Sequence, residues 1–191
     1  MPGPLALSPA QIRWVKSVTL EEGMLAYGPS DPESRVFEPG DRFFLHASED
    51  DAYSLDDPAV GDVILLTQHA QATHLVRVVG VRSEPRPRAE LRRPHGKRFP
   101  FRRECELLRM KDFEEAPLIE EAFGFDPRAQ GGEVFEIAEL SAFSAADTPL
   151  WLVQRRILAA FDGPSLRRER PRMTSSHRRE RIVPLPRDPR R

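Results

Sequence analysis

The stretch that decides the fold is VGDVILLTQHAQATHLVRVVGV, residues 60–81. It opens with Gly61 and Asp62, which are common turn residues, and continues with side chains that are mostly β-branched or aliphatic. We therefore predict one strand over 63–68 and a second over 73–81, with a short connection between them. Two such strands separated by a few residues pair most simply as an antiparallel hairpin.

Apolar segments outside this hairpin predict further strands. Each is rich in β-branched, aliphatic or aromatic residues, which suits a half-buried pleated surface. The predicted strands cover residues 12–18, 42–46, 104–110 and 133–140. They lie far apart in the sequence, so the sheet they build depends on long-range pairing.

Three helices are predicted, at residues 19–26, 117–122 and 148–161. The first rests on Thr19 and Glu22, which have the spacing of a capping box. The last has the strongest pattern, because Thr148 is a candidate N-cap, Pro149 stands at the first helical position and apolar residues recur at helical spacing. Short helices beside many strands indicate an α+β protein.

The net charge of −1 hides four segments of alternating sign. Residues 1–81 carry 5 basic and 12 acidic side chains, whereas residues 82–103 carry 9 basic and 2 acidic ones. Residues 104–163 are again acidic, with 5 basic against 13 acidic side chains, and residues 164–191 are basic, with 10 against 3. Such asymmetry favours a polyanionic partner.

The chain of 191 residues fits one folded domain with flexible ends. We predict a single domain over 9–163, with a basic insertion at 82–103. Residues 1–8 are expected to be flexible. Residues 164–191 hold five prolines, ten arginines and few large apolar groups, so they are predicted to form a disordered basic tail.

The 60–81 stretch, taken with Trp14-Val15-Lys16-Ser17-Val18, resembles the PUA-like superfamily, and within it the ASCH and EVE/YTH-type domains. The resemblance covers roughly residues 12–140. It implies a small, bent, mixed β-barrel with short flanking helices. It also implies binding of RNA or DNA, frequently at a modified nucleotide, and a few members hydrolyse modified nucleosides. The basic insertion at 82–103 departs from the compact pattern of the superfamily.

The insertion, called the basic arm below, is the strongest candidate for contact with nucleic acid. Arginine binds phosphate through two parallel hydrogen bonds, and neutralised phosphates release counterions. Phe99 and Phe101 stand among the cations and could stack on unpaired bases. The predicted phosphate-binding residues are Arg92, Arg93, Lys97, Arg98, Arg102 and Arg103. Two alternatives remain open: the arm's charges pair with the acidic segments, or they bind an acidic groove of another protein.

A few residues are candidates for a pocket that holds an unstacked or modified base. Trp14 and Tyr53 could form its walls by stacking, and Thr73 and His74 could contribute polar contacts. The alternatives are that Trp14 belongs to the core, that Tyr53 is an exposed loop residue and that His74 is a satisfied or surface histidine. His69 and His74 lack a third ligand in the sequence, so no metal site is predicted.

Several classes of function find no support in the sequence. The single cysteine, Cys105, alternates with two glutamates and is predicted to be buried and unreactive. No nucleophile elbow or phosphate-binding glycine loop occurs, so neither a catalytic residue nor a cofactor is predicted. No apolar run approaches the roughly 18 residues of a membrane helix. The N-terminus also lacks the pattern of a secretory signal, which favours a cytoplasmic protein.

These observations favour a nucleic-acid-binding module without catalytic activity, in which RNA and DNA are equal candidates. One rival is a hydrolase of a modified nucleoside, which needs a Lys or Glu near Thr73, with Lys16 and Lys97 as candidates. The other rival is a protein–protein adaptor. Salt-dependent binding of oligonucleotides separates the three.

Overall fold

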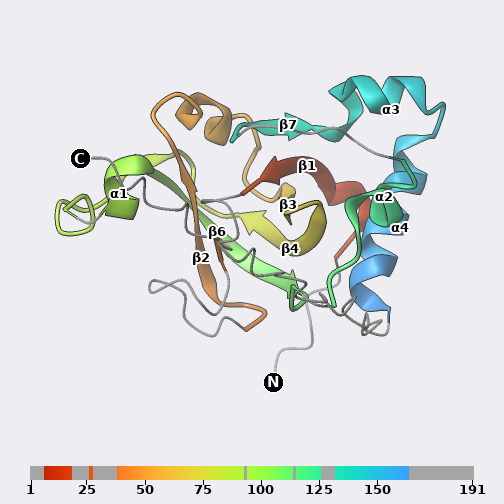
Figure 1. The fold of residues 1–191 in the computed structure, drawn as a ribbon, viewed down its shortest axis with the longest axis horizontal. Coiled ribbons are helices and arrows are strands. Elements are labelled where there is room, and N and C mark those ends of the chain that lie inside the picture. Colours follow the sequence, from red (N-terminus) through yellow and green to blue (C-terminus); the bar gives the residue numbers. More distant parts are fainter. Residues whose placement is uncertain are drawn as a thin grey trace, which may run out of the picture.

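The computed structural model describes residues 7–18, 26–27, 38–92, 94–113, 115–125 and 132–163. Within them one mixed sheet has the strand order β2-β6-β4-β3-β1-β7, and a short β5 pairs with β6 (Figure 1). The strands are β1 (Ile12–Ser17), β2 (Arg42–Ala47), β3 (Val63–Gln68), β4 (Gln71–Val78), β5 (Glu84–Pro85), β6 (Phe101–Met110) and β7 (Val134–Glu136). The predicted α+β class with a mixed sheet is confirmed.

The helices are short apart from the last one. The α-helices are α1 (Pro94–Arg98), α2 (Ile119–Phe123), α3 (Ser141–Ala145) and α4 (Leu150–Asp162). The 3-10 helices are η1 (Pro9–Gln11), η2 (Ala52–Asp56) and η3 (Ile137–Glu139). At the start of α4, Pro149 is the N-cap residue and the Thr148 hydroxyl donates to the Ala146 carbonyl, so Thr148 does not cap the helix as predicted.

The predicted hairpin is present as β3 and β4, which pair antiparallel. Its connection is shorter than predicted, because β4 begins at Gln71 and only two residues join the strands. These residues, His69 and Ala70, have φ values of 45° and 62°. Positive φ at both central residues is the geometry of a tight hairpin turn that usually has Asn and Gly at these positions. His and Ala do not predict such a turn, so it could not be recognised from the sequence.

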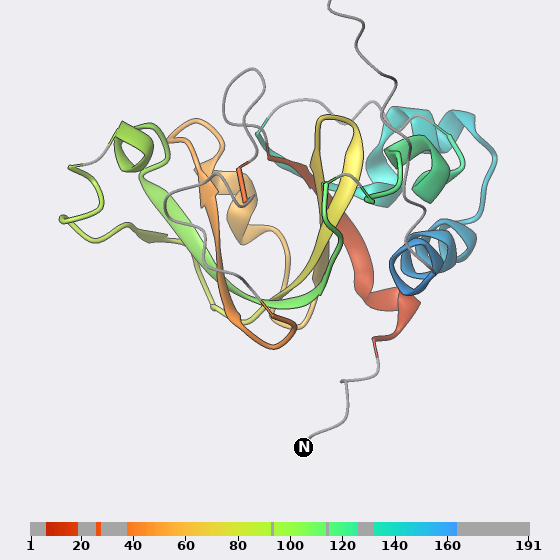
Figure 2. The same ribbon diagram turned by 60° about the horizontal axis from the view of Figure 1, so that its bottom comes forward.

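Pairing of β1 makes the sheet mixed. β1 runs parallel to β3 and antiparallel to β7, so the first strand of the chain lies between strands that come much later. β6 pairs with β2 along one part and with β4 along another. Figure 2 shows the resulting curl, with β2 on one side of a half-barrel and β1, β3 and β4 on the other.

Two hydrophobic clusters lie on opposite faces of the curled sheet. Alternate residues of one strand divide between them, as Leu65 and Leu66 of β3 do, because successive side chains of a strand point to opposite faces. The outer cluster packs against α2 and α4, which cover the convex face (Figure 2). The inner cluster fills the curl and includes Phe43, Cys105 and Leu107. Cys105 is fully buried, as predicted.

Several predicted boundaries change in the structure. β6 begins at Phe101, so the end of the basic arm belongs to the sheet. The rest of the arm contains β5 and α1. β7 ends at Glu136 and gives way to η3, which shortens the strand predicted over 133–140. The helix predicted over 19–26, apart from Ala26, and the predicted tail 164–191 lie outside the described residues.

Candidate functional site

A hollow opens where β1 and β2 end, at one end of the curl's interior. The hollow is open to solvent, and the space inside it that a water-sized molecule can occupy is about 50 Å³, which is small beside the roughly 300–1,000 Å³ of ligand sites. Its lining residues are Lys16, Ser17, Val18, Ala26, Tyr27, His46, Ala47, Ser48, Asp51, Phe99 and Gly132. Segments far apart in the sequence therefore meet at this point.

Lys16 is the most unusual residue of the hollow. In β1 it stands opposite Leu66 and Val134, both members of the inner cluster, so it belongs to the sheet's apolar inner face. Only 2% of the residue is exposed. Among the described residues, no hydrogen-bond or ion-pair partner holds its ammonium group. Burial lowers the pKa of Lys16 to about 8, and the charges of Asp51 and Glu133 oppose that shift only in part.

Asp51 supplies a carboxylate to the same hollow and is held by its own loop. The Ser48 hydroxyl donates to Asp51 Oδ2 at 2.6 Å, and the Asp51 backbone N–H donates back to Ser48 Oγ at 3.2 Å. The backbone of Gly132 packs against the carboxylate so closely that a Cβ there would clash with Oδ2. The position of the Asp51 carboxylate is therefore fixed from two sides.

Aromatic side chains form apolar parts of the wall. The Tyr27 ring lies 4.6 Å from that of Phe43, measured between centroids, and its hydroxyl accepts the backbone N–H of His46 at 3.1 Å. Phe99, which directly follows α1, also lines the hollow. The guanidinium of Arg98 lies 5.3 Å from the Phe99 ring centroid. The hollow thus adjoins the basic arm.

None of the four residues predicted for the pocket lines this hollow. The Trp14 indole N–H donates to Asp62 Oδ2 at 2.8 Å, and its ring packs against the inner cluster. Tyr53 is 62% exposed, and its hydroxyl donates to Glu133 Oε1 at 2.5 Å. Both side chains take the structural roles that the sequence left open as alternatives.

Thr73 and His74 are buried and do not line the hollow. The Nδ1 atom of His74 lies 2.8 Å from Thr73 Oγ1, and the imidazole ring lies 6.0 Å from the Tyr27 ring, centroid to centroid. Burial lowers the pKa of His74 to about 4, so this histidine is neutral at physiological pH. It supports Tyr27 and offers no charge to a ligand.

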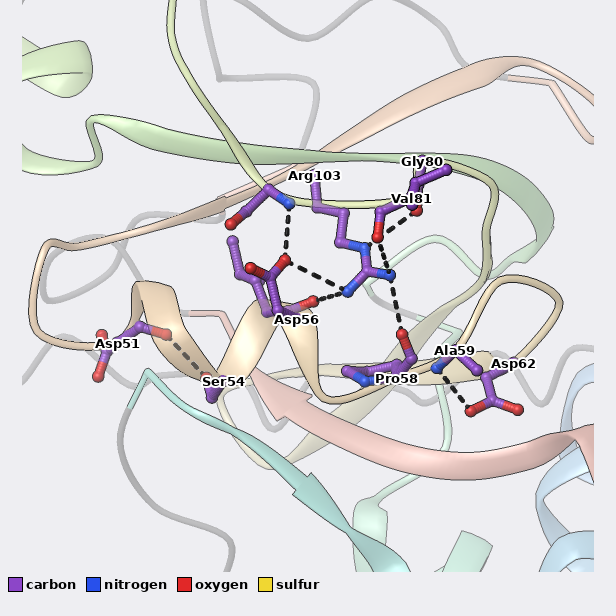
Figure 3. Close-up of polar contacts among 11 residues, drawn as sticks. Asp51, Ser54, Asp56, Pro58, Ala59, Asp62, Gly80, Val81 and Arg103 are labelled. Carbon is purple, nitrogen blue, oxygen red and sulfur yellow. Dashed lines mark hydrogen bonds and ion pairs between the residues drawn. The ribbon is translucent and has the colours of Figure 1, made fainter.

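Arg103 of the basic arm is buried and satisfied by the protein itself (Figure 3). Only 2% of it is exposed. Its guanidinium donates to the carbonyls of Leu55, Pro58, Gly80 and Val81, and lies 3.6 Å from Asp56 Oδ1. The guanidinium is engaged by these groups, so Arg103 has a structural role and is not available to a phosphate.

Arg102 is also engaged within the protein. It donates to Glu84 at 2.8 Å and lies 3.7 Å from Glu90. Its guanidinium stacks on the ring of Phe44 at 4.2 Å from the centroid. The alternative in which the arm's charges pair internally therefore describes this residue.

Arg86 of the arm is buried as well and pairs with Glu90 at 2.9 Å, whereas the other described cations of the arm are on the surface. Arg92, Lys97 and Arg98 are exposed, while Arg93 lies outside the described residues. Neither Arg92 nor Lys97 forms an ion pair with any described residue. Arg82 and Arg88, also in the arm, are exposed and share this property. The arm is therefore divided between an inner part that builds the fold and an outer part that is open to solvent.

The sequence contains a second signal at Lys16, beyond the mention of this residue as a candidate for the hydrolase. In the strand Ile12–Ser17, Lys16 shares a face with Trp14, and the next residue on that face is Val18. A lysine on the apolar face of an alternating strand is costly to bury and therefore marks a candidate site. Asp51 and Ser48 gave no comparable signal, because acidic and hydroxyl residues are ordinary in loops.

The described residues show neither a metal cluster nor a membrane-spanning helix. No group of three or more His, Cys, Asp or Glu side chains there is arranged to hold a metal ion. No helix in that part of the chain combines the length and the apolar character needed to cross a membrane.

The structure is similar to a solved RNA-binding domain. The YTH domain of the Zygosaccharomyces rouxii MRB1 protein, solved in complex with N6-methyladenosine RNA, superposes with a TM-score of 0.45 and 9% identity. The superposition covers 79% of this chain and 92% of that domain. No protein-family model and no curated protein sequence matches the chain.

Proposed function

We propose that the protein binds single-stranded nucleic acid, RNA or DNA, with an unstacked base in the hollow and backbone phosphates on the outer part of the basic arm. The observation that carries this proposal is the continuity of the two features. Phe99 lines the hollow, and Lys97 and Arg98 immediately precede it in α1. A nucleotide needs a base site and phosphate-binding cations next to each other, because its phosphates are covalently linked to the sugar that carries the base.

The chemistry of the two features divides affinity from selectivity. Exposed arginine and lysine side chains bind phosphates and release counterions, whatever the base sequence. The hollow offers aromatic surface from Tyr27 and Phe99 together with the polar groups of Lys16 and Asp51. A base stacked on an aromatic ring contributes about 1–3 kcal/mol in known single-strand complexes. The arm would supply most of the affinity, and the hollow would select the base.

Charge reversal on the arm tests the proposal. The variant Arg92→Glu/Lys97→Glu/Arg98→Glu is expected to bind a mixed-sequence oligonucleotide at least about tenfold more weakly at about 50 mM salt, with a shallower salt dependence. Fluorescence anisotropy with labelled RNA and DNA measures both quantities. The matched control is Arg155→Glu on α4, which lies at the other end of the molecule from α1 (Figure 1).

Two results would contradict the proposal. The first is that the unchanged protein binds neither RNA nor DNA at low salt. The second is that the arm variant and the α4 control bind equally well, since the outer arm would then make no phosphate contact.

A second candidate function is hydrolysis of a modified nucleoside. The observation in its favour is Lys16, a buried amine with a lowered pKa that could take a proton from an attacking water. Thr73, which was expected beside such a lysine, does not line the hollow. Incubation of the protein with a panel of modified nucleosides, followed by chromatography, tests this function. Product that forms with the unchanged protein but not with Lys16→Met would establish it.

A further inference from the structure

Lys16 is deeply buried and yet faces a hollow that is open to solvent. Only 2% of the residue is exposed, and it is one of the lining residues. Burial lowers the pKa of Lys16 to about 8, so about a tenth of its side chain is a neutral amine at pH 7, against less than about a thousandth for an ordinary lysine. A neutral amine in an apolar pocket is a nucleophile for carbonyl carbons. The hollow therefore offers an amine that is prepared to attack a carbonyl group.

Two carboxylates act on this amine, and one of them lines the hollow with it. The charges of Asp51 and Glu133 both influence Lys16. The Tyr53 hydroxyl donates to Glu133 Oε1 at 2.5 Å, and Glu133 is not a lining residue. Asp51 does line the hollow, where the Ser48 hydroxyl fixes its position. A carboxylate beside an attacking amine takes up the proton that the amine loses and passes it to the departing oxygen. The hollow thus combines a nucleophile with a group for proton transfer.

The size of the hollow limits what reaches Lys16. The space that a water-sized molecule can occupy is about 50 Å³, which is room for a few water molecules. An unbranched chain that ends in a carbonyl fits such a space with its reactive carbon foremost. Nucleic acid carries such a chain where a base has been lost, because the base-free deoxyribose opens to an aldehyde at C1′. Its flanking phosphates suit Lys97 and Arg98, which precede Phe99 at the hollow.

We propose that the hollow captures abasic sites in DNA, with Lys16 as the nucleophile for the aldehyde of the base-free deoxyribose. An intact nucleotide brings its base to this position, and a base-free one brings its aldehyde. The inference rests on the proposed function, because the outer part of the basic arm must hold the strand while the sugar enters the hollow.

The capture is the formation of an imine. The lone pair of Lys16 Nζ attacks C1′, and the electrons of the carbonyl double bond move to its oxygen. Asp51 carries one proton from the nitrogen to that oxygen, which gives a carbinolamine. The nitrogen then forms a double bond to C1′ as the C–O bond breaks, and the oxygen leaves as water with the second nitrogen proton. Asp51 ends as the carboxylate, and no oxidant or reductant is needed.

Reductive trapping tests the capture. The full chain is mixed with sodium cyanoborohydride and a single-stranded oligodeoxynucleotide that contains one abasic site, made by removal of a uracil with a glycosylase. Hydride from the reagent converts the imine into a stable secondary amine. A denaturing gel is expected to show a protein–DNA adduct, and mass spectrometry of its peptides is expected to place the sugar on Lys16. The same strand with its uracil in place is the matched control and should give no adduct.

Variants identify the groups that react. Lys16→Met and Lys16→Arg both remove the nucleophilic amine, and the second keeps a cation. Each is expected to lower the yield of adduct at least about tenfold. Asp51→Asn keeps an acceptor for Ser48 but loses the proton transfer, so adduct formation should slow at least about tenfold. Lys111→Met is the lysine control, because Lys111 donates to the Gly163 carbonyl and does not line the hollow. It should leave the yield unchanged.

The outcomes separate this inference from the function on which it rests, since anisotropy measures strand binding in the same samples. No adduct despite strand binding, an adduct that survives in Lys16→Met, or a sugar attached to another residue overturns the capture and leaves nucleic-acid binding standing. Equal labelling of Lys16 by free deoxyribose at the same concentration also overturns it, because the strand would then play no part. No binding of any strand at about 50 mM salt overturns both.

Discussion

Two cations of this molecule are buried to the same degree and are treated in opposite ways. Arg103 and Lys16 are each 2% exposed. Arg103 has carbonyl acceptors on several sides and Asp56 nearby, whereas the Lys16 side chain has no such partner among the described residues. The first charge holds loops to the sheet. The second faces a hollow, and burial disfavours its charged form, so burial alone does not tell a structural charge from one that is open to a ligand.

Removal of Arg103 should produce the largest effect. Arg103→Met would leave the carbonyls of Leu55 and Pro58 without their donor in a buried site. We expect the free energy of unfolding to fall by about 3–5 kcal/mol, as it does when one partner of a buried charged network is removed. Urea denaturation followed by tryptophan fluorescence measures this.

The control for Arg103→Met is Arg102→Met, which removes a partly exposed charge from the same strand. It should cost about 1 kcal/mol or less. Equal losses of unfolding free energy in the two variants would mean that the buried Arg103 guanidinium contributes no more to stability than the partly exposed ion pair of Arg102.

Removal of the Lys16 charge should have the opposite sign. Lys16→Met takes away an ammonium whose charged form is disfavoured by burial and keeps most of the apolar contact. The free energy of unfolding is expected to rise by about 1–3 kcal/mol, because a lowered pKa means that folding acts against the charged form of the side chain. A loss of stability in urea would show that the folded protein satisfies the ammonium.

The gain from Lys16→Met should depend on pH. The pKa of Lys16 is about 8 in the folded protein against 10.5 in the unfolded chain. Between these values the unfolded state binds more protons, so the stability of the unchanged protein rises with pH. The advantage of Lys16→Met is therefore full below about pH 8 and disappears as the pH approaches 10.5.

Urea denaturation of the unchanged protein and of Lys16→Met across this pH range measures the difference in their unfolding free energies directly. Cys105 also has a perturbed pKa, because burial raises that of its thiol to about 12. It is present in both proteins, so its contribution cancels. A difference that does not change with pH would mean that the lysine keeps its ordinary pKa.

Removal of the Ser48 hydroxyl should have the smallest effect on stability. It would give Lys16 an ion-pair partner, as Arg103 already has. Ser48→Ala frees one side of the Asp51 carboxylate, which can then move towards the ammonium. We expect a change in unfolding free energy of about 1 kcal/mol or less, since a lost hydrogen bond is offset by a new ion pair. The pKa of Lys16, followed by NMR, should rise, and an unchanged pKa would contradict this account.

The sequence predicted the fold better than the site. The hairpin of β3 and β4 follows from its alternating apolar residues, although its left-handed turn at His69 and Ala70 could not be foreseen from residue type. The alternation that placed Cys105 inside also places Arg103 inside, two residues earlier on the same strand. We missed this because the predicted strand began at residue 104, after the last arginine of the basic arm.

The composition of the hollow lay beyond sequence reasoning for a physical reason. Its walls depend on the curl of the sheet, which brings the end of β2 to the end of β1 although these strands are not paired. The alternation of residues in a strand predicts which side chains share a face of the sheet. It does not predict which loops come together at the end of the curled sheet. Trp14 and Tyr53 were chosen as conspicuous aromatics, whereas Tyr27 stands in a segment with little pattern.

The pairing of β1 with β3 and β7 also sets the order in which the site can come into existence. During synthesis Lys16 leaves the ribosome early, but Gly132 and β7 follow more than a hundred residues later. Gln154 of α4, later still, donates to the Ile12 carbonyl at 3.1 Å. Contacts of such long range form slowly and late. A nascent or truncated chain that stops before β7 therefore carries an incomplete hollow, and the binding of a base becomes a property of the finished molecule alone.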